Sequence, residues 1–377
     1  MERLLSMRNS NTNLISVVFI LLVVNLIVFG AWFYVREKSL LKDGSDKDEQ
    51  FSLIRNEKYL IEYISNIYND KKIIFFGSSE SHNNYSIPSQ LNYMEPQNNY
   101  ENISKGWLSP IHLSLIFSKI GKLNISIPPI VLLINPVYFT KTHNRIDEGG
   151  LGNVVKSTLF IKMNHNNILA DLDKDTKNIF KKYFLHNKLI FPFDYQKYIL
   201  NLLYLSSRQS NFNWENFSYR DKPYKFNHLI PDYSVDKNTW PRYKPVDEFM
   251  KKDWVIINDE LSPNMIGLKT IFSTIYKKSI PGLVILLPTN IKYYQHIGLD
   301  SLEYSRRDLI LRKQIKNMAF SNALTVIDLN DDFRLNLGFK DRMHNDEYGF
   351  YQICKYLIDS KNYSEFKNSV AQYYINR

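Results

Sequence analysis

The chain has 377 residues, of which 44% are hydrophobic, so a wholly disordered protein is excluded and one large α/β domain or two smaller ones can form. The formal net charge of +10 favours acidic partners such as phosphate polymers or anionic lipid, although compositional drift explains the abundant Lys equally well. No long Lys/Arg run and no nucleic-acid motif is present, so nucleic acid is not an expected partner.

The first element along the chain is an apolar segment from Leu14 to Val35, broken only by one serine and one asparagine. As a helix it spans about 33 Å, which is enough to cross a bilayer. We interpret it as an uncleaved single transmembrane helix that follows a short tail, residues 1–13; a long signal peptide is the alternative. Basic residues flank the segment on both sides, so charge alone does not orient it.

The remaining pattern predicts an α/β domain. Residues 36–50 are polar, as in a linker, and 51–70 have apolar side chains at helical spacing. Continuous apolar segments predict buried parallel strands, and two helical patterns lie between and after the last of them. The predicted strands are 71–76, 129–135, 282–287 and 324–329, and the helices are 302–320 and 347–358. Strands alternating with helices predict a three-layer sandwich with a central parallel sheet.

We interpret residues 51–377 as one domain, with an insertion or cap at about 141–250 that is rich in aromatic residues, Asn and Lys. The single cysteine, Cys354, excludes an intrachain disulfide and a cysteine-based zinc site. It falls in the last predicted helix, where we expect a small buried side chain rather than a nucleophile.

The first chemical motif is the turn Gly77-Ser78-Ser79-Glu80, directly after a predicted strand. A nucleophilic serine suits this position because ligands bind at the carboxyl ends of parallel strands. Glycine permits a tight turn, and the following backbone N–H groups can face a developing oxyanion. An ordinary strand-to-helix cap is the alternative for this segment by itself.

The second motif is Asp341-Arg342-Met343-His344, after the last strand and before a helix. An aspartate can orient a histidine three residues later, and the histidine can then act as general base toward a serine. The alternative is a capping aspartate with a surface histidine. Together the two motifs supply the whole set of groups that a nucleophilic serine needs.

A G-x-S near the first strand and a D-x-x-H near the C-terminus resemble the SGNH hydrolase superfamily. More specifically, the chain resembles the DltD family, the D-alanyl transfer proteins of lipoteichoic acid D-alanylation. The resemblance rests on the N-terminal anchor and on FGSSE at 76–80, VLLINPVYFT at 131–140, LPTNIKYYQHIGL at 287–299, VIDLNDDF at 326–333 and KDRMHNDEYGF at 340–350. No motif in 141–250 matches.

The resemblance implies an SGNH-hydrolase-like fold in which Ser79 is the nucleophile, His344 the base and Asp341 its orienter; Ser78 is the less favoured nucleophile. The expected oxyanion donors are the Ser79 backbone N–H, Gly106 and Asn135. For Asn135 the alternative is a polar turn before a proline. No cofactor and no metal are expected.

The implied activity is serine O-acyl transfer, with D-alanyl as the expected group and a hydroxyl of an anionic envelope glycopolymer or lipid as acceptor. A membrane-bound O-acyltransferase or a D-alanyl carrier protein is the expected donor-side partner. The resemblance implies a catalytic domain outside the cytoplasm, at the cell surface or in the periplasm. Two alternatives stay open: an envelope esterase or thioesterase with the same triad, and a non-catalytic membrane-tethered assembly subunit.

Overall fold

The computed structural model describes most of the predicted α/β domain. The described residues are 57–77, 86–104 without Asn98, 109–141, 255–290, 301–330 and 347–376, with isolated positions at 19, 23, 174, 178, 339 and 345. The chain divides into two compact units, Met1–Arg55 with Ile190–Phe217, and Asn56–Leu189 with Ser218–Arg377. Every element discussed below belongs to the second unit.

Within the described residues, five parallel strands form one sheet in the order β2-β1-β3-β4-β5. The strands are β1 (Ile73–Gly77), β2 (Tyr100–Ser104), β3 (Ile130–Ile134), β4 (Gly282–Leu286) and β5 (Thr325–Asp328). Four of them confirm the predicted strands to within two residues at each end. β1, β3 and β4 are buried at every position, which explains their continuous apolar sequences. The edge strand β2 was not predicted, because Glu101 and Asn102 interrupt its apolar pattern.

The helices that accompany the sheet include the three predicted from the periodicity at 51–70, 302–320 and 347–358; the helical runs predicted near 175–206 lie outside the described residues, apart from Asn178. They are α3 (Glu57–Asn69), α4 (Ile87–Met94), α5 (Pro110–Lys122), the 3-10 helix η2 (Pro136–Phe139), α12 (Pro263–Lys277), α14 (Ser301–Ser321), α16 (Glu347–Asp359) and α17 (Lys361–Ile375). Cys354 lies in α16 and is fully buried, which confirms its expected packing role. Its burial, with a smaller contribution from the charge of Glu95, raises the pKa of the thiol.

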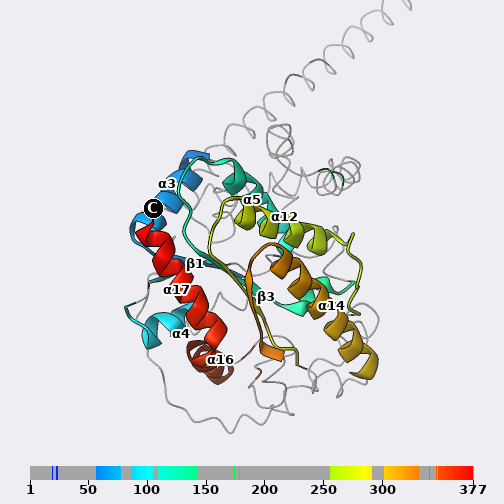
Figure 1. The fold of residues 1–377 in the computed structure, drawn as a ribbon. Coiled ribbons are helices and arrows are strands. Elements are labelled where there is room, and N and C mark those ends of the chain that lie inside the picture. Colours follow the sequence, from blue (N-terminus) through cyan, green and yellow to red (C-terminus); the bar gives the residue numbers. More distant parts are fainter. Residues whose placement is uncertain are drawn as a thin grey trace, which may run out of the picture. The chain divides into compact units, whose positions relative to one another are not determined.

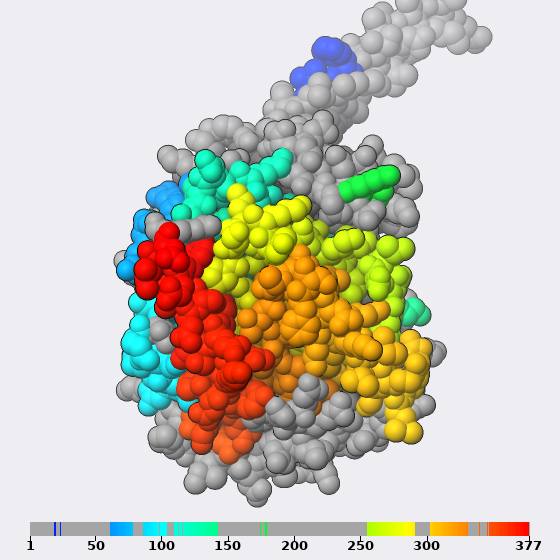
Figure 2. Space-filling model, in the orientation of Figure 1, coloured from blue at the N-terminus to red at the C-terminus, as the bar shows by residue number. Residues whose placement is uncertain are grey.

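Helices cover both faces of the sheet, as expected for a doubly wound fold (Figure 1). On one face, alternate strand residues such as Phe75 and Val131 form a single core with apolar side chains of α4, α16 and α17. On the other face, Phe76 packs against Phe117 of α5, with ring centroids 5.0 Å apart. The strand order explains the division: right-handed crossovers from β1 to β2 and from β2 to β3 run in opposite directions and place their helices on opposite faces. Figure 2 shows the molecule from a direction in which helices of both layers, α12 and α14 from one and α17 from the other, are visible at the surface.

The chain leaves the sheet domain after η2 and returns to the same point before α12. Thr140 and Ile256 form an antiparallel bridge, and the Lys141 N–H donates to the Val255 carbonyl oxygen at 2.9 Å. Residues 142–254 lie outside the described residues, apart from Lys174 and Asn178. The two ends of this stretch are therefore bound to each other.

The predicted N-terminal segments, 1–13, 14–35 and 36–50, lie outside the described residues apart from Phe19 and Val23. Among the helices of the described part of the chain, none has the length and apolar character needed to cross a bilayer. The predicted transmembrane helix and the predicted domain limits stay predictions.

A close helix contact gives the first testable prediction. At Gly267 of α12, an added Cβ would lie 2.6 Å from the Ile111 Cα and from the carbonyl carbon of Pro110, both in the backbone of α5. Gly267→Ala should therefore force the two helices apart. We expect a loss of about 2 kcal/mol in the free energy of unfolding, because overpacking outweighs the gain of about 1 kcal/mol in helix propensity. Urea unfolding measures the difference.

The matched control is Gly121→Ala in α5. There the nearest atom to an added Cβ is the Thr274 Cγ2 at 3.4 Å, an ordinary contact. This variant should be as stable as the wild type or slightly more stable. Equal effects at the two glycines would contradict the close approach of α5 and α12.

Candidate functional site

The carboxyl edge of the sheet is where the predicted site residues follow the strands. β1 ends at Gly77, which the register pairs with Ser104, the last residue of β2. β3 ends at Ile134, directly before Asn135. The strand order reverses between β1 and β3, because β2 lies on one side of β1 and the later strands lie on the other. In open parallel sheets, ligands bind outside the carboxyl ends of the strands at such a switch point, so this edge is the candidate site.

Of the predicted site residues, the structure describes only Asn135; Ser79, Gly106, Asp341 and His344 lie outside the described residues. Their places in the chain relate them to described elements. Ser79 follows the end of β1 by two residues, Gly106 follows the end of β2 by two, and the D-x-x-H segment lies between β5 and α16. All of them come after strands that end at the same edge. The geometry of the triad stays a prediction.

The helices that follow the two motifs pack against each other. α4 begins eight residues after Ser79, and α16 begins three residues after His344. The side-chain amide of Gln90 in α4 donates to the Glu347 carbonyl oxygen at the start of α16, at 3.0 Å and across 257 positions of sequence. Both helices also contribute to the same apolar core. The helices that follow the two motifs are therefore neighbours in the fold.

The D-x-x-H segment lies between two described residues that pair with each other. Phe339 and Asn345 form an isolated antiparallel bridge, and Asn345, directly after His344, is buried. The two ends of the stretch 340–344 are therefore held together just before α16.

Asn135 caps the turn that begins at Pro136, which is the alternative role expected from the sequence. It is the N-cap of η2, and its side-chain oxygen accepts a hydrogen bond from the Val137 N–H at 3.0 Å. The residue is 2% exposed, so its side chain is held inside the protein at the end of β3. The cap fixes the direction in which the chain leaves the switch point. A role as oxyanion donor stays a prediction.

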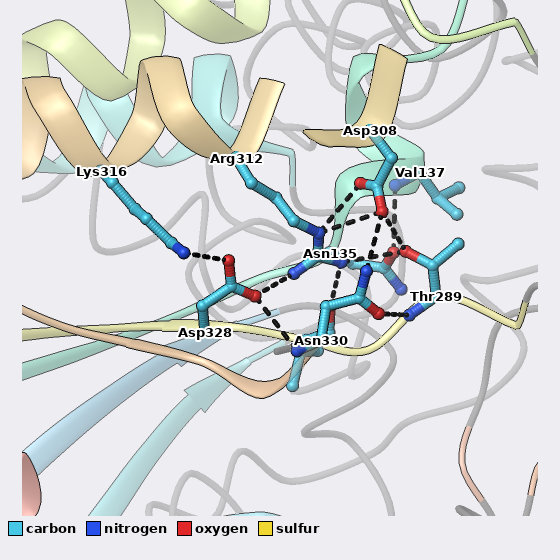
Figure 3. Close-up of polar contacts among 9 residues, drawn as sticks. Asn135, Val137, Thr289, Asp308, Arg312, Lys316, Asp328 and Asn330 are labelled. Atoms are coloured by element: carbon cyan, nitrogen blue, oxygen red, sulfur yellow. Dashed lines mark hydrogen bonds and ion pairs between the residues drawn. The ribbon is translucent and has the colours of Figure 1, made fainter. Parts of the chain in front are cut away.

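A buried charged network lies at the ends of β4 and β5 (Figure 3). Its centre is Arg312 of α14, which is 1% exposed. The guanidinium donates to Asp308, four residues earlier in the same helix, and to Asp328, the last residue of β5, at 3.0 Å and 2.6 Å. It also donates to the Leu287 carbonyl oxygen and to the Thr289 hydroxyl at 2.8 Å and 2.9 Å. One side chain therefore joins α14 to the ends of two strands.

A second set of contacts completes the network. The Asp308 carboxylate accepts from the Thr289 hydroxyl and from the Asn330 side-chain amide, each at 3.2 Å. Lys316 forms an ion pair with Asp328 at 2.7 Å. Two carboxylates thus face one guanidinium and one ammonium group, so the formal charges balance. Buried charges are stable in a protein only when they are paired and hydrogen-bonded in this way.

The network shifts the titration of its members. Burial by itself raises the pKa of Asp328, but the charge of Arg312 and the hydrogen bond from Lys316 outweigh it, so the pKa of this carboxyl lies below its ordinary value. Burial by itself lowers the pKa of Arg312, and the charges of Asp308 and Asp328 reverse that effect. Both groups are therefore ionised at neutral pH.

This shift predicts acid sensitivity. A carboxyl with a lowered pKa in the folded state contributes stability above its unfolded pKa of about 3.9, and the contribution is lost as the pH falls through the folded value. Asp328→Asn should lose about 3 kcal/mol of unfolding free energy at pH 7, because Arg312 and Lys316 lose their shared counter-charge. As the pH falls from about 5 to about 2, the unfolding free energy of the variant should also decrease less than that of the wild type. Urea midpoints measured across this range test both effects.

Asp359→Asn is the matched control, because Asp359 is an exposed carboxylate at the end of α16. It should change the unfolding free energy by less than about 0.5 kcal/mol at pH 7. If the unfolding free energy of Asp328→Asn and of the wild type decreased in parallel as the pH falls, the proposed ionised pair would be contradicted.

Sequence analysis did not identify Arg312, Asp308, Thr289 or Asn330. A signal was present, because an Asp and an Arg four residues apart in the helical pattern 302–320 lie on one helix face. Such pairs are usually exposed, so only the fold distinguishes this buried pair from the exposed pairs of Glu303 with neighbouring arginines. Within the described parts of the chain, no group of three or more His, Cys, Asp or Glu side chains could hold a metal ion.

These features define an α/β protein of the doubly wound type, with its candidate site at the carboxyl edge beside the switch point. Comparison with protein families then identifies the relationship: residues 204–360 match the model of the DltD protein family. The match spans α12, β4, α14, β5, the D-x-x-H segment and α16, and it is to the same family that the sequence motifs resemble. No curated protein matches the chain. The DltD family itself is linked to D-alanylation of teichoic acids.

Proposed function

We propose that this protein is a membrane-anchored serine O-acyltransferase with an SGNH-hydrolase-like fold. It transfers D-alanyl groups to a hydroxyl of an envelope glycopolymer or lipid through an acyl-Ser79 intermediate. The observation that carries the proposal is the DltD match, because it includes the segment with Asp341 and His344. The fold supports it, since Ser79 follows the strand that flanks the switch point.

In the proposed mechanism, His344 accepts the proton of the Ser79 hydroxyl as the serine oxygen attacks the carbonyl carbon of the acyl donor. Asp341 holds the imidazole in the required tautomer. The Ser79 N–H, Gly106 and Asn135 stabilise the oxyanion. His344 returns the proton to the leaving group, and the acyl group stays on Ser79 as an ester.

The second half reverses these steps with a new nucleophile. An acceptor hydroxyl gives its proton to His344 and attacks the acyl-serine carbonyl. Ser79 then leaves with the proton returned by His344, and an ester of the acceptor is formed. Water in place of the acceptor would make the protein an esterase, so exclusion of water distinguishes the transferase.

The expected donor-side partner is a membrane-bound O-acyltransferase or a D-alanyl carrier protein. The expected acceptor is an anionic glycopolymer or lipid. The net charge of +10 supports an anionic acceptor, because a cationic surface attracts polyanions and speeds their encounter.

Intact-mass analysis of the purified protein tests the proposal. After exposure to D-alanyl donors, the wild type should gain the mass of one alanyl group, and peptide mapping should locate it on Ser79. Ser78→Ala is the matched control, because it alters the neighbouring hydroxyl and should still form the adduct. An adduct on Ser78, or none with any donor in the presence of the membrane partner, would contradict the proposed intermediate. Rapid release of the acyl group without an acceptor would favour the esterase.

The protein is proposed to cross the membrane once, with its catalytic domain outside the cytoplasm, at the cell surface or in the periplasm. A C-terminal alkaline phosphatase fusion should therefore be active in whole cells, since this reporter matures only outside the cytoplasm. A fusion that lacks residues 1–35 should be inactive. Activity of a cytoplasm-specific reporter at the same C-terminal position would contradict this placement.

A further inference from the structure

The buried network around Arg312 lies at the carboxyl ends of β4 and β5. Leu287 and Thr289 follow β4, and Asp328 is the last residue of β5. After Asn330 the chain continues to Asp341 and His344. The network is therefore placed to control where these two strand ends point.

The contacts of Arg312 are distributed across separate elements rather than within one helix. The Nε donates to Asp308 in α14, the Nη1 to Asp328 in β5, and the Nη2 to Leu287 and Thr289 after β4. A planar guanidinium has a fixed fork of donors, so it fixes the directions of its partners as well as their distances. A lysine ammonium group cannot reproduce this arrangement.

The second contacts close the arrangement into a ring. Asp308 accepts from Thr289 and from Asn330, which joins the segment after β4 to the segment after β5. The side chains of Asp308 and Arg312 are each 2% exposed. Because a well-packed apolar cluster is often as stable as a buried ion pair, stability alone does not account for a network at this position.

We infer that Arg312 is a positioning residue that sets the geometry of the carboxyl ends of β4 and β5, and through it the approach of His344 to Ser79. The second part rests on the proposed function. Arg312 touches no reacting atom in this account; it acts through Thr289, Asp328 and Asn330.

The first measurement is amide hydrogen exchange of the full-length protein in detergent, which is independent of any enzymatic activity. In Arg312→Lys, exchange at 287–290 and 328–330 should accelerate by about tenfold or more, because local opening becomes easier. Amides of β1 and β3 should keep their wild-type rates. Unchanged exchange at the two strand ends, or equal acceleration throughout the sheet, would overturn the inference.

Thr289 supplies a milder test that does not depend on the stability of Arg312→Lys. Thr289→Val keeps the side-chain shape but removes the hydroxyl that contacts Arg312 and Asp308, whereas Thr289→Ser keeps the hydroxyl. Exchange at the strand ends should accelerate in Thr289→Val and return toward the wild-type rate in Thr289→Ser. Arg306→Lys is the control on α14, because Arg306 is exposed and pairs with Glu303.

The second measurement is the rate at which a fluorophosphonate probe modifies Ser79 in the folded variants. Arg312→Lys should be modified about 10- to 100-fold more slowly, since small displacements of a catalytic base have effects of this size, and Arg306→Lys should match the wild type. Faster exchange with an unchanged modification rate would overturn the link to the triad. If the wild type itself is not modified at Ser79, the proposed function fails, and the exchange data still decide the role of Arg312 at the strand ends.

Discussion

Ser79→Ala should abolish acyl transfer while the protein stays folded. The proposed intermediate is an ester of this hydroxyl, so the variant lacks the group that would carry the acyl chain. Loss of a triad nucleophile lowers kcat by about 10⁴-fold or more. The unfolding free energy should change by less than about 1 kcal/mol, because the change removes one hydroxyl. Acylation of the acceptor, measured together with urea unfolding, tests both expectations.

The control for this prediction is Ser78→Ala, which should keep activity close to the wild-type value. The two serines are neighbours after Gly77, so the comparison separates loss of the nucleophile from disturbance of the turn. Near-normal activity in Ser79→Ala with loss in Ser78→Ala would transfer the role to Ser78. Near-normal activity in both variants would leave the non-catalytic assembly subunit as the better account.

His344 and Asp341 should act with Ser79 as a unit. His344→Ala should lower kcat nearly as much as Ser79→Ala, and the double variant should be scarcely worse than either, because effects within a triad are strongly non-additive. Asp341→Asn should be milder than loss of either of the other two. Steady-state kinetics of the three single variants and the double variant measure this coupling.

The structural requirement behind this prediction is a distance. The His344 imidazole must approach the Ser79 hydroxyl to about 2.6–3.2 Å in the productive complex. The contact between Gln90 and Glu347 already joins the helices that follow the two motifs. Losses that multiply in the double variant would show that Ser79 and His344 act independently and would remove the basis for the triad.

Much of the fold was predictable because its strands are buried on both faces. IIFF, IVLLI and GLVIL are continuous apolar runs, and TVID has Val and Ile at its centre; all four form strands of the parallel sheet. β2 was not predicted, because a strand at the edge of a sheet can carry polar residues. One of them, Glu101, forms an ion pair at 3.3 Å with Lys72, directly before β1. α17 has many polar residues, and only its buried stripe, which includes Tyr363 and Phe366, reveals its packing.

The class of fold and the resemblance to the DltD family could be predicted from the sequence, because apolar periodicity and short motifs are local properties of the chain. The family match at residues 204–360 bears out that relationship. The order of the strands, and therefore the switch point between β1 and β3, needed the tertiary structure.

The burial of Arg312 and its contacts with two strand ends could be seen only in the three-dimensional structure. In sequence, Asp308 and Arg312 are an ordinary helical pair, no different from Glu303 and Arg307. In the fold, one pair is buried at the ends of β4 and β5 and the other is partly exposed. The difference depends on which residues from distant parts of the chain pack over each pair. The spacing of residues along one helix does not contain that information.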